Sequence, residues 1–185
     1  MFSAIYKNIH RDAKQFILQL DNYEEMKFIL DASVFISGFK TPGEQSVTVP
    51  GVLEELRDAR SRIQFELAER SGMKVEESDE KLIHEVKERS KDIGDFEYLS
   101  QTDIHILAKA LEYLEQGTAI VTDDYAIQNV AAHLNISVMP IMQDGIKEVL
   151  RWTKRCSGCG RYFEAGEVCP VCGSKLKKSR KTKKE

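Results

Sequence analysis

All four cysteines of the chain lie in one 17-residue window, as Cys156-Ser-Gly-Cys159 and Cys169-Pro-Val-Cys172 with nine residues between the pairs. Two CxxC turns at this separation present four thiolates to one tetrahedral metal, which is the pattern of a zinc ribbon. Two disulfides are the alternative, but nothing in the sequence indicates secretion, so zinc is favoured. Because the four sulfurs form a complete ligand set, we expect a closed structural site and look for chemistry upstream.

Charge divides the chain into two parts. Residues 151–185 carry eleven Lys or Arg against three acidic residues, a formal +8, while residues 1–150 hold the remaining 16 basic and 27 acidic residues, or −11. The last segment, Ser174 to Glu185, has seven Lys or Arg in twelve residues and one apolar side chain. Such a tail should be disordered in isolation. A solubility tail is one interpretation, but beside a zinc ribbon the basic charge favours contact with nucleic-acid phosphates.

Short apolar strands alternate with helices between residues 26 and 150, which predicts a parallel sheet flanked by helices, an α/β fold. We expect strands at 28–30, 46–49, 74–76, 119–121 and 136–141. We expect a short helix after Asp31 and further helices at 51 to about 71, 80–91, 103–117, 125–134 and 145 to about 152.

The predicted organisation is an N-terminal extension (1–25), an α/β domain (26–150), a zinc ribbon (151–173) and a basic tail (174–185). The extension predicts either an amphipathic helix or an over-long start, with Met26 as the alternative first residue. No apolar run approaches the ~20 residues that span a bilayer, and no signal peptide is evident. We therefore expect a cytoplasmic protein without a membrane partner.

Acidic residues follow the predicted strands and open the next helices, at the edge where parallel sheets bind ligands. Each alone is explained as a helix cap or a solvated surface residue. Together they would repel, since two carboxylates ~5 Å apart cost roughly 3 kcal/mol at an effective dielectric near 20. Oxygen ligands without His or Cys suit Mg²⁺ or Mn²⁺. These residues are Asp31, Glu54, Glu55, Asp103, Asp123 and Asp124.

Four stretches around these acids resemble the acidic motifs of PIN-domain ribonucleases. They are Leu30-Asp-Ala-Ser-Val-Phe35, Thr48-Val-Pro-Gly-Val-Leu-Glu-Glu-Leu-Arg-Asp58, Leu99-Ser-Gln-Thr-Asp-Ile104 and Val121-Thr-Asp-Asp-Tyr-Ala-Ile-Gln-Asn129. Together with the four-cysteine ribbon, residues 26–172 resemble the compact archaeal form of the Nob-type endonucleases, which mature the 3′ end of small-subunit ribosomal RNA. The resemblance implies a PIN-like fold and a Mg²⁺- or Mn²⁺-dependent endoribonuclease that leaves a 5′-phosphate and a 3′-hydroxyl.

The same resemblance assigns the catalytic and metal-binding acids position by position. Glu55 is preferred to Glu54 because it precedes a Leu-Arg-Asp triplet, and Asp124 is preferred to Asp123 because of a Thr-x-Asp pattern. Asp123 is then a neighbouring ligand or a group behind the ligands. The acids so assigned are Asp31, Glu55, Asp103 and Asp124.

Other polar residues are candidates for substrate contacts. Ser33 and Thr122 could hydrogen-bond the carboxylates or a scissile phosphate, or serve only as local backbone partners. In the ribbon, Arg155 and Arg161 are expected on RNA phosphates. The ribbon aromatics, Tyr162 and Phe163, could stack on bases, but at least one is expected in the ribbon core.

The implied partners are precursor small-subunit ribosomal RNA and the pre-ribosomal small subunit, and a homo-oligomer could help to position the RNA. One alternative is a PIN nuclease with another RNA target, such as a toxin, which the zinc ribbon argues against. The other is a non-catalytic RNA-binding assembly factor, which the complete set of motif acids argues against.

Overall fold

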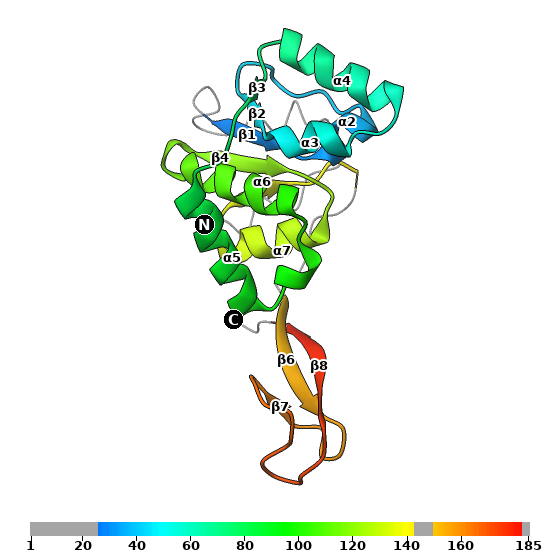
Figure 1. Cartoon of the computed structure of the whole chain (residues 1–185), viewed down its shortest axis with the longest axis vertical. Helices are drawn as coiled ribbons and strands as arrows, with labels where there is room; N and C mark the ends of the chain where they lie inside the picture. Colours follow the sequence, from blue (N-terminus) through cyan, green and yellow to red (C-terminus); the bar gives the residue numbers. More distant parts are fainter. Residues whose placement is uncertain (1–25, 143–149, 183–185) are drawn as a thin grey trace.

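A parallel five-stranded sheet forms the centre of the body in the computed structural model, which describes residues 26–142 and 150–182 (Figure 1). The strand order is β3-β2-β1-β4-β5, and every pairing is parallel. The predicted parallel sheet is therefore confirmed. Its strands are β1 (Lys27–Leu30), β2 (Ser46–Thr48), β3 (Lys74–Val75), β4 (Thr118–Val121) and β5 (Ser137–Met139).

Helices flank this sheet. Helix α6 packs against β1 and β4, α5 packs along α6, and α7 packs against β5. No helix in the described parts of the chain is both long and apolar enough to span a membrane. The elements are α2 (Ala32–Ser37), α3 (Pro50–Glu55), α4 (Ala59–Arg70), α5 (Glu80–Ile93), α6 (Gln101–Glu112) and α7 (Tyr125–His133), with 3₁₀ turns η2 (Phe96–Tyr98) and η3 (Leu114–Gln116).

The single helix predicted from 51 to about 71 is wrong, because the chain forms two helices there. Asp58 is extended, and its side chain accepts a hydrogen bond from the backbone N–H of Ser61 at 2.9 Å, which starts α4 anew. Buried Leu56 ends α3 just before this cap. An internal Asp cap thus divides what periodicity alone reads as continuous. The predicted end at Gly72 is confirmed by its φ of +100°, which glycine tolerates.

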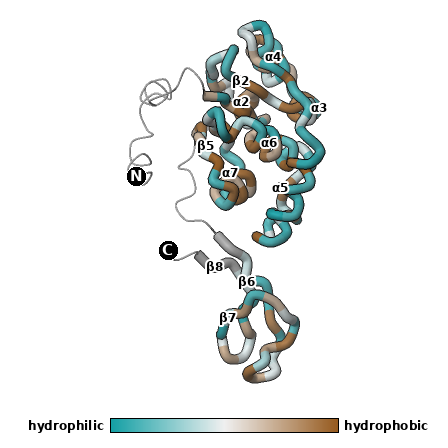
Figure 2. The backbone as a smooth tube through the Cα atoms, turned by 90° about the vertical axis from the view of Figure 1, so that its left-hand side faces the viewer, coloured by the Kyte–Doolittle hydropathy of each residue, from teal (hydrophilic) through white to brown (hydrophobic). Residues whose placement is uncertain are grey.

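The core is built on the two central strands. Phe28, Ile29 and Leu30 of β1 and Ile120 and Val121 of β4 are almost completely buried. Figure 2 shows hydrophobic segments gathered inside the body and hydrophilic ones along the outer helices α4 and α5. Burial of both faces explains why these strands are continuous apolar runs. The loops that follow β1 and β4 therefore start from well-packed strands of the core.

The C-terminal part is a three-stranded antiparallel sheet, in the order β7-β6-β8, that projects from the body (Figure 1). The predicted disordered tail is wrong up to Thr182, because β8 pairs with β6 along its whole length. Backbone pairing needs no apolar side chains, and Leu176, the one apolar residue of the tail, is buried in the ribbon core. The strands are β6 (Leu150–Cys156), β7 (Tyr162–Phe163) and β8 (Leu176–Thr182).

Two other predictions concern residues within or next to the ranges that the structure does not describe. The helix expected from 145 to about 152 is wrong at its end, where Leu150 to Trp152 are part of strand β6. Residues 143–149, the extension 1–25 with its possible helix, and residues 183–185 lie outside the described residues.

Candidate active site

Asp31 and Thr122 lie side by side at the carboxyl end of the two central strands. They follow Leu30 and Val121, which are register partners in the parallel β1–β4 pair. The hydroxyl of Thr122 donates to Oδ2 of Asp31 at 2.7 Å. Sheet register therefore brings together two residues that are 91 positions apart in the sequence.

The Asp31 carboxylate is held by three hydrogen bonds and is only 6% exposed. Its Oδ1 accepts from the N–H of Ala32 at 2.6 Å, and its Oδ2 accepts from the hydroxyls of Ser33 and Thr122, each at 2.7 Å. A carboxylate offers about four lone-pair positions, so about one is left for a cation or a water. Ser33 and Thr122 thus orient the acid, as one of the two sequence interpretations proposed.

Both hydroxyls are themselves oriented by backbone N–H groups. The N–H of Asp124 donates to Oγ1 of Thr122 at 2.9 Å, and the N–H of Asp123 donates to Oγ of Ser33 at 3.4 Å. Each hydroxyl therefore accepts from a backbone N–H and donates its own proton to the Asp31 carboxylate. The loop after β4 and the start of α2 therefore form one polarised network around Asp31.

Asp103 and Asp124 are both first-turn or cap residues of neighbouring helices. Asp124 caps α7, accepting from the N–H of Ala126 at 2.6 Å. Asp103 forms a capping box with Ser100, in which its Oδ2 accepts from the Ser100 N–H at 2.7 Å. The prediction that these acids cap helices is therefore confirmed for Asp103 and Asp124. A cap residue can also have a functional role.

The pKa of Asp103 is raised by burial and, in part, by the negative charges of the neighbouring carboxylates. Burial is the main cause that raises this pKa to about 6, and the charges of Asp124 and Asp31 raise it further, while the bonds from Ser100 lower it in part. Clustered carboxylates that disfavour their own ionisation are stabilised by a divalent cation. The donor set, oxygen only, fits a hard cation such as Mg²⁺ or Mn²⁺.

Glu55 is the last residue of α3 and is exposed, as is Glu54. The start of α3 adjoins the first turn of α6, since a Cβ on Gly51 would lie 2.7 Å from Oγ1 of Thr102. Glu55 is one helical turn beyond Gly51 and therefore lies on the same face of α3 as Gly51. Within the described ranges no three acids have carboxylate oxygens within 4.8 Å of one another, so the place of Glu55 in the site stays a prediction.

Asp123 has a different role in the structure. Its carboxylate accepts hydrogen bonds from the backbone N–H of Ile141 at 2.8 Å and of Met142 at 3.1 Å. These bonds connect the loop after β4 to Ile141 and Met142, which follow β5. Asp123 therefore anchors this segment, and its predicted role as a neighbouring ligand or a group behind the ligands stays a prediction.

The four cysteines form the second candidate site. Their sulfur atoms lie within 4.8 Å of one another, with 3.3 Å between Cys156 and Cys172 and 3.7 Å between Cys159 and Cys169. These separations exclude disulfides, whose sulfurs lie about 2.05 Å apart. They approach the ~3.8 Å edge of a tetrahedron with metal–sulfur bonds near 2.3 Å. The four thiols could therefore hold one zinc ion.

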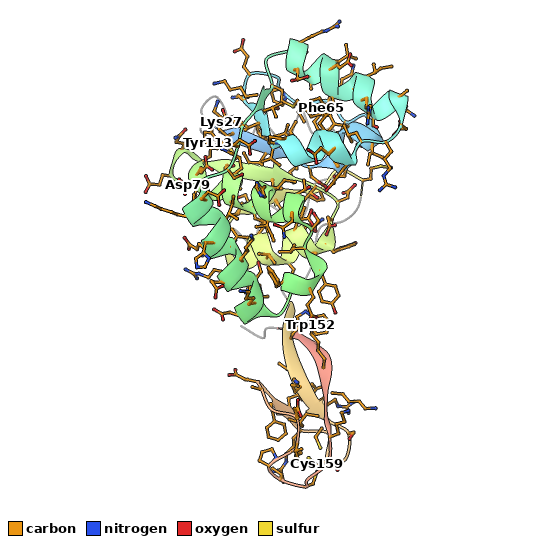
Figure 3. The ribbon with its side chains drawn as sticks, in the orientation of Figure 1. Lys27, Phe65, Asp79, Tyr113, Trp152 and Cys159 are labelled. Carbon is orange, nitrogen blue, oxygen red and sulfur yellow. The ribbon has the colours of Figure 1, made fainter. Side chains whose placement is uncertain are left out.

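Hydrogen bonds to the cysteine sulfurs favour the thiolate form, which is the form that binds a metal. The N–H groups of Gly158 and Cys159 point at Sγ of Cys156 at 3.3 and 3.4 Å, and hydrogen bonds from Ser174 lower the pKa of Cys172 to about 6. Figure 3 places Cys159 at the tip of the ribbon, far from the body. The cysteine site is therefore separate from the acidic edge.

The remaining ribbon predictions divide into two groups. Phe163 packs on the buried core of the ribbon, so the prediction that one ribbon aromatic would be internal is confirmed. Tyr162 is exposed, and the guanidinium of Arg155 lies 5.9 Å from the centre of its ring. Arg155 and Arg161 are both exposed and accessible to a polyanion.

Sequence reasoning missed Asp95. This buried carboxylate accepts from Nδ2 of Asn129 and from Nε1 of Trp152, at 2.5 Å for the latter, and so joins the body to the ribbon. No sequence signal identifies it, because its partners are 34 and 57 residues away.

Comparison with known proteins identifies the family. A family model described as the PIN domain of ribonuclease matches residues 28–113. "Endoribonuclease Nob1" of Archaeoglobus fulgidus is 42% identical over 148 residues, covering 79% of this chain and 86% of the relative. The Nob1 protein of Methanothermobacter thermautotrophicus is 34% identical over 168 residues, 88% and 98% of the two chains. "Ribonuclease VapC1" of Thermoplasma acidophilum is 32% identical over 178 residues, 91% and 90% of the two chains. With its acidic edge and four-cysteine ribbon, the chain belongs to the Nob1 family of PIN-domain endoribonucleases.

Proposed function

We propose that this protein is a divalent-metal-dependent endoribonuclease that cleaves precursor small-subunit ribosomal RNA at its 3′ end during ribosome maturation. The observation that carries the proposal is the mutual proximity of Asp31, Asp103 and Asp124 at the carboxyl edge of β1 and β4 in a member of the Nob1 family. The pre-ribosomal small subunit is the partner in which this RNA would be met. A homo-oligomer has no support in the comparisons.

The described residues suggest how the site would work. Asp31, Asp103 and Asp124, with Glu55 beside them, would hold one or two Mg²⁺ or Mn²⁺ ions, which supply charge compensation for the phosphate and activation of water. Ser33 and Thr122 hold the Asp31 carboxylate in one orientation. Asp31 is largely buried, so little of its carboxylate is open to solvent.

The ribbon is suited to bind the phosphates of the substrate. In the β6–β8 pair, the exposed residues Arg155 and Lys177 lie directly opposite each other. Like charges directly opposite on paired strands destabilise each other, and bound phosphates would remove this cost. We therefore propose that RNA binding has a steep salt dependence that is reduced by replacing Arg155 or Arg161.

The test is cleavage, with Mn²⁺, of a pre-ribosomal RNA fragment that spans the mature 3′ end. Asp31→Asn and Asp103→Asn should abolish a single cut at that end without loss of RNA binding. Asp79→Asn is the matched control, because Asp79 also caps a helix but contacts Glu112, at the far end of α6. Nine residues of helix, about 13 Å, separate Glu112 from Asp103.

Two other outcomes would change the assignment. Tight binding without a cut, unchanged by either variant, would favour the non-catalytic assembly factor. Metal-dependent cutting of unrelated RNA, with no preference for the ribosomal 3′ end, would favour the other candidate, a PIN nuclease with another RNA target.

A further inference from the structure

The ribbon meets the body around Trp152, the only tryptophan of the chain (Figure 3). Its indole Nε1 donates to Oδ1 of Asp95 at 2.5 Å, and Oδ2 of the same carboxylate accepts from Nδ2 of Asn129. Asp95 is only 6% exposed. A buried carboxylate therefore links the first strand of the ribbon directly to helix α7.

Aromatic rings of the ribbon and the body also pack together at this junction. Trp152 stacks on Tyr98 of the body, with ring centres 5.5 Å apart and planes at 12°. The amine of Lys178, on β8, lies 4.6 Å from the Trp152 ring and 5.2 Å from the Tyr98 ring, and it pairs with Glu97 at 2.9 Å. Both long strands of the ribbon thus contact the η2 turn.

The body leaves space for the indole at Gly94. A Cβ there would lie 2.8 Å from Cβ and 2.9 Å from Cδ1 of Trp152, closer than side chains approach one another. Gly94 also ends α5 with a φ of +86°, which side chains rarely adopt. The backbone of the body is therefore shaped around this one ribbon residue.

Both sides of segment 143–149 are held to elements of the active site. Asp123 anchors Ile141 and Met142 next to the loop that carries Asp124. The Asp95 link joins Trp152 to Asn129, five residues along α7 from Asp124, which is about 7.5 Å of helix. A ribbon on a free tether would need neither contact.

We propose that the Trp152 junction fixes the ribbon relative to the acidic edge and thereby determines which phosphodiester bond is cut. The substrate is then an RNA in which the element bound by the ribbon and the cleaved bond are a set distance apart. The choice of bond rests on the proposed function, whereas docking of the ribbon does not.

Docking is tested on the zinc-loaded full chain without RNA, with Trp152 as its own reporter. In the wild type, fluorescence anisotropy decay should show the indole tumbling with the whole protein. Gly94→Ala keeps the fluorophore but occupies its space, so a fast segmental component should appear and the emission should shift to the red. Val168→Ala, at an exposed ribbon position away from the junction, is the control and should change neither property.

Small-angle scattering gives a second measure. Trp152→Ala should increase the radius of gyration, because loss of one hydrogen bond to a charged group lowers a docking equilibrium by about tenfold or more. Trp152→Phe keeps a ring to stack on Tyr98, so its radius of gyration should lie between those of the wild type and Trp152→Ala. A wild-type indole that moves freely, an unchanged anisotropy decay in Gly94→Ala, or an unchanged radius of gyration in Trp152→Ala would overturn the docked arrangement.

Cleavage mapping tests the consequence. The wild type should cut the pre-ribosomal fragment at one bond, and Trp152→Ala should spread the cuts over neighbouring bonds while its rate on a short unstructured RNA stays the same. Loosened variants that still cut only at the original bond would overturn the role of the junction in site choice. If the wild type cuts no RNA, the proposed function fails, and the anisotropy and scattering results still decide the docking.

Discussion

Replacing Asp103 with Asn should stabilise the protein when no Mg²⁺ or Mn²⁺ is present. The pKa of Asp103 is raised from 3.8 to about 6, so the folded protein favours the protonated acid. A shift of about 2 pKa units corresponds to ~3 kcal/mol at 1.36 kcal/mol each. Because Asp103 is partly exposed, solvent screening reduces this to about 1–2 kcal/mol. The neutral amide oxygen can still accept from the Ser100 N–H, so the cap survives.

The sign of the pH dependence follows from the raised pKa. Below the unfolded pKa of 3.8 the acid is protonated in both states and costs nothing. Between pH 3.8 and about 6 the unfolded chain loses this proton while the folded protein keeps it, so the stability of the wild type falls relative to the variant as the pH rises through this range. The advantage of Asp103→Asn should therefore grow between pH 4 and pH 7 and then stay constant.

Thermal unfolding of the zinc-loaded protein from pH 4 to 8 measures this effect, which should be about 2–8 °C at neutral pH. Added Mn²⁺ should reverse the order, because only the wild type keeps the full set of carboxylates. Asp58→Asn is a control of opposite sign, since hydrogen bonds from Ser61 lower the pKa of Asp58 and its charge supports α4. An Asp103→Asn protein that is less stable at pH 7, or a difference that is independent of pH, would refute the reasoning.

Three further changes test other parts of the molecule. Thr122→Val removes a hydroxyl that donates to Asp31 and should cost about 1–3 kcal/mol in denaturant unfolding, with weaker Mn²⁺ binding in calorimetry; unchanged values for both would contradict the network. Cys172→Ser should lose stoichiometric zinc in elemental analysis and unfold the ribbon while the body keeps its cooperative transition. Lys109→Met leaves Glu112 and a backbone carbonyl without their buried cation and should cost about 3–5 kcal/mol in the same denaturant assay, whereas a loss below 1 kcal/mol would argue against the ion pair.

Much of the body could be predicted because its signals are local. A strand such as Phe28-Ile-Leu30, buried on both faces, is a continuous apolar run, and Asp31 directly after it marks the start of a helix. The cysteine pairs carry their spacing in the sequence, and the structure brings their sulfurs together. The edge that carries Asp31, Asp103 and Asp124 could be predicted for the same reason, since strand ends in a parallel sheet meet at one edge.

The errors arise where a partner is distant in the sequence. Strand β8 looked like a disordered tail because its stabilising partner is the backbone of β6, about 26 residues earlier at Thr153 and Ser179. The anchoring contacts of Asp123 could not be predicted for the same reason, because its carboxylate accepts from amides 18 and 19 residues away. The break before α4 was a different error, in which a continuous helical pattern outweighed a local Asp cap.

The order of strands also has a consequence for synthesis of the chain. Strand β1 pairs with β4, and the Asp31 carboxylate receives the Thr122 hydroxyl only after 91 further residues have been added. At about 5–20 residues per second, translation needs roughly 5–18 s to supply that partner. Throughout this interval the acidic edge is incomplete, because β4 and the loop after it, which bring Thr122 and Asp124 next to Asp31, have not yet been made. Late pairing of β4 thus delays assembly of the acidic edge until the chain has been synthesised past Asp124.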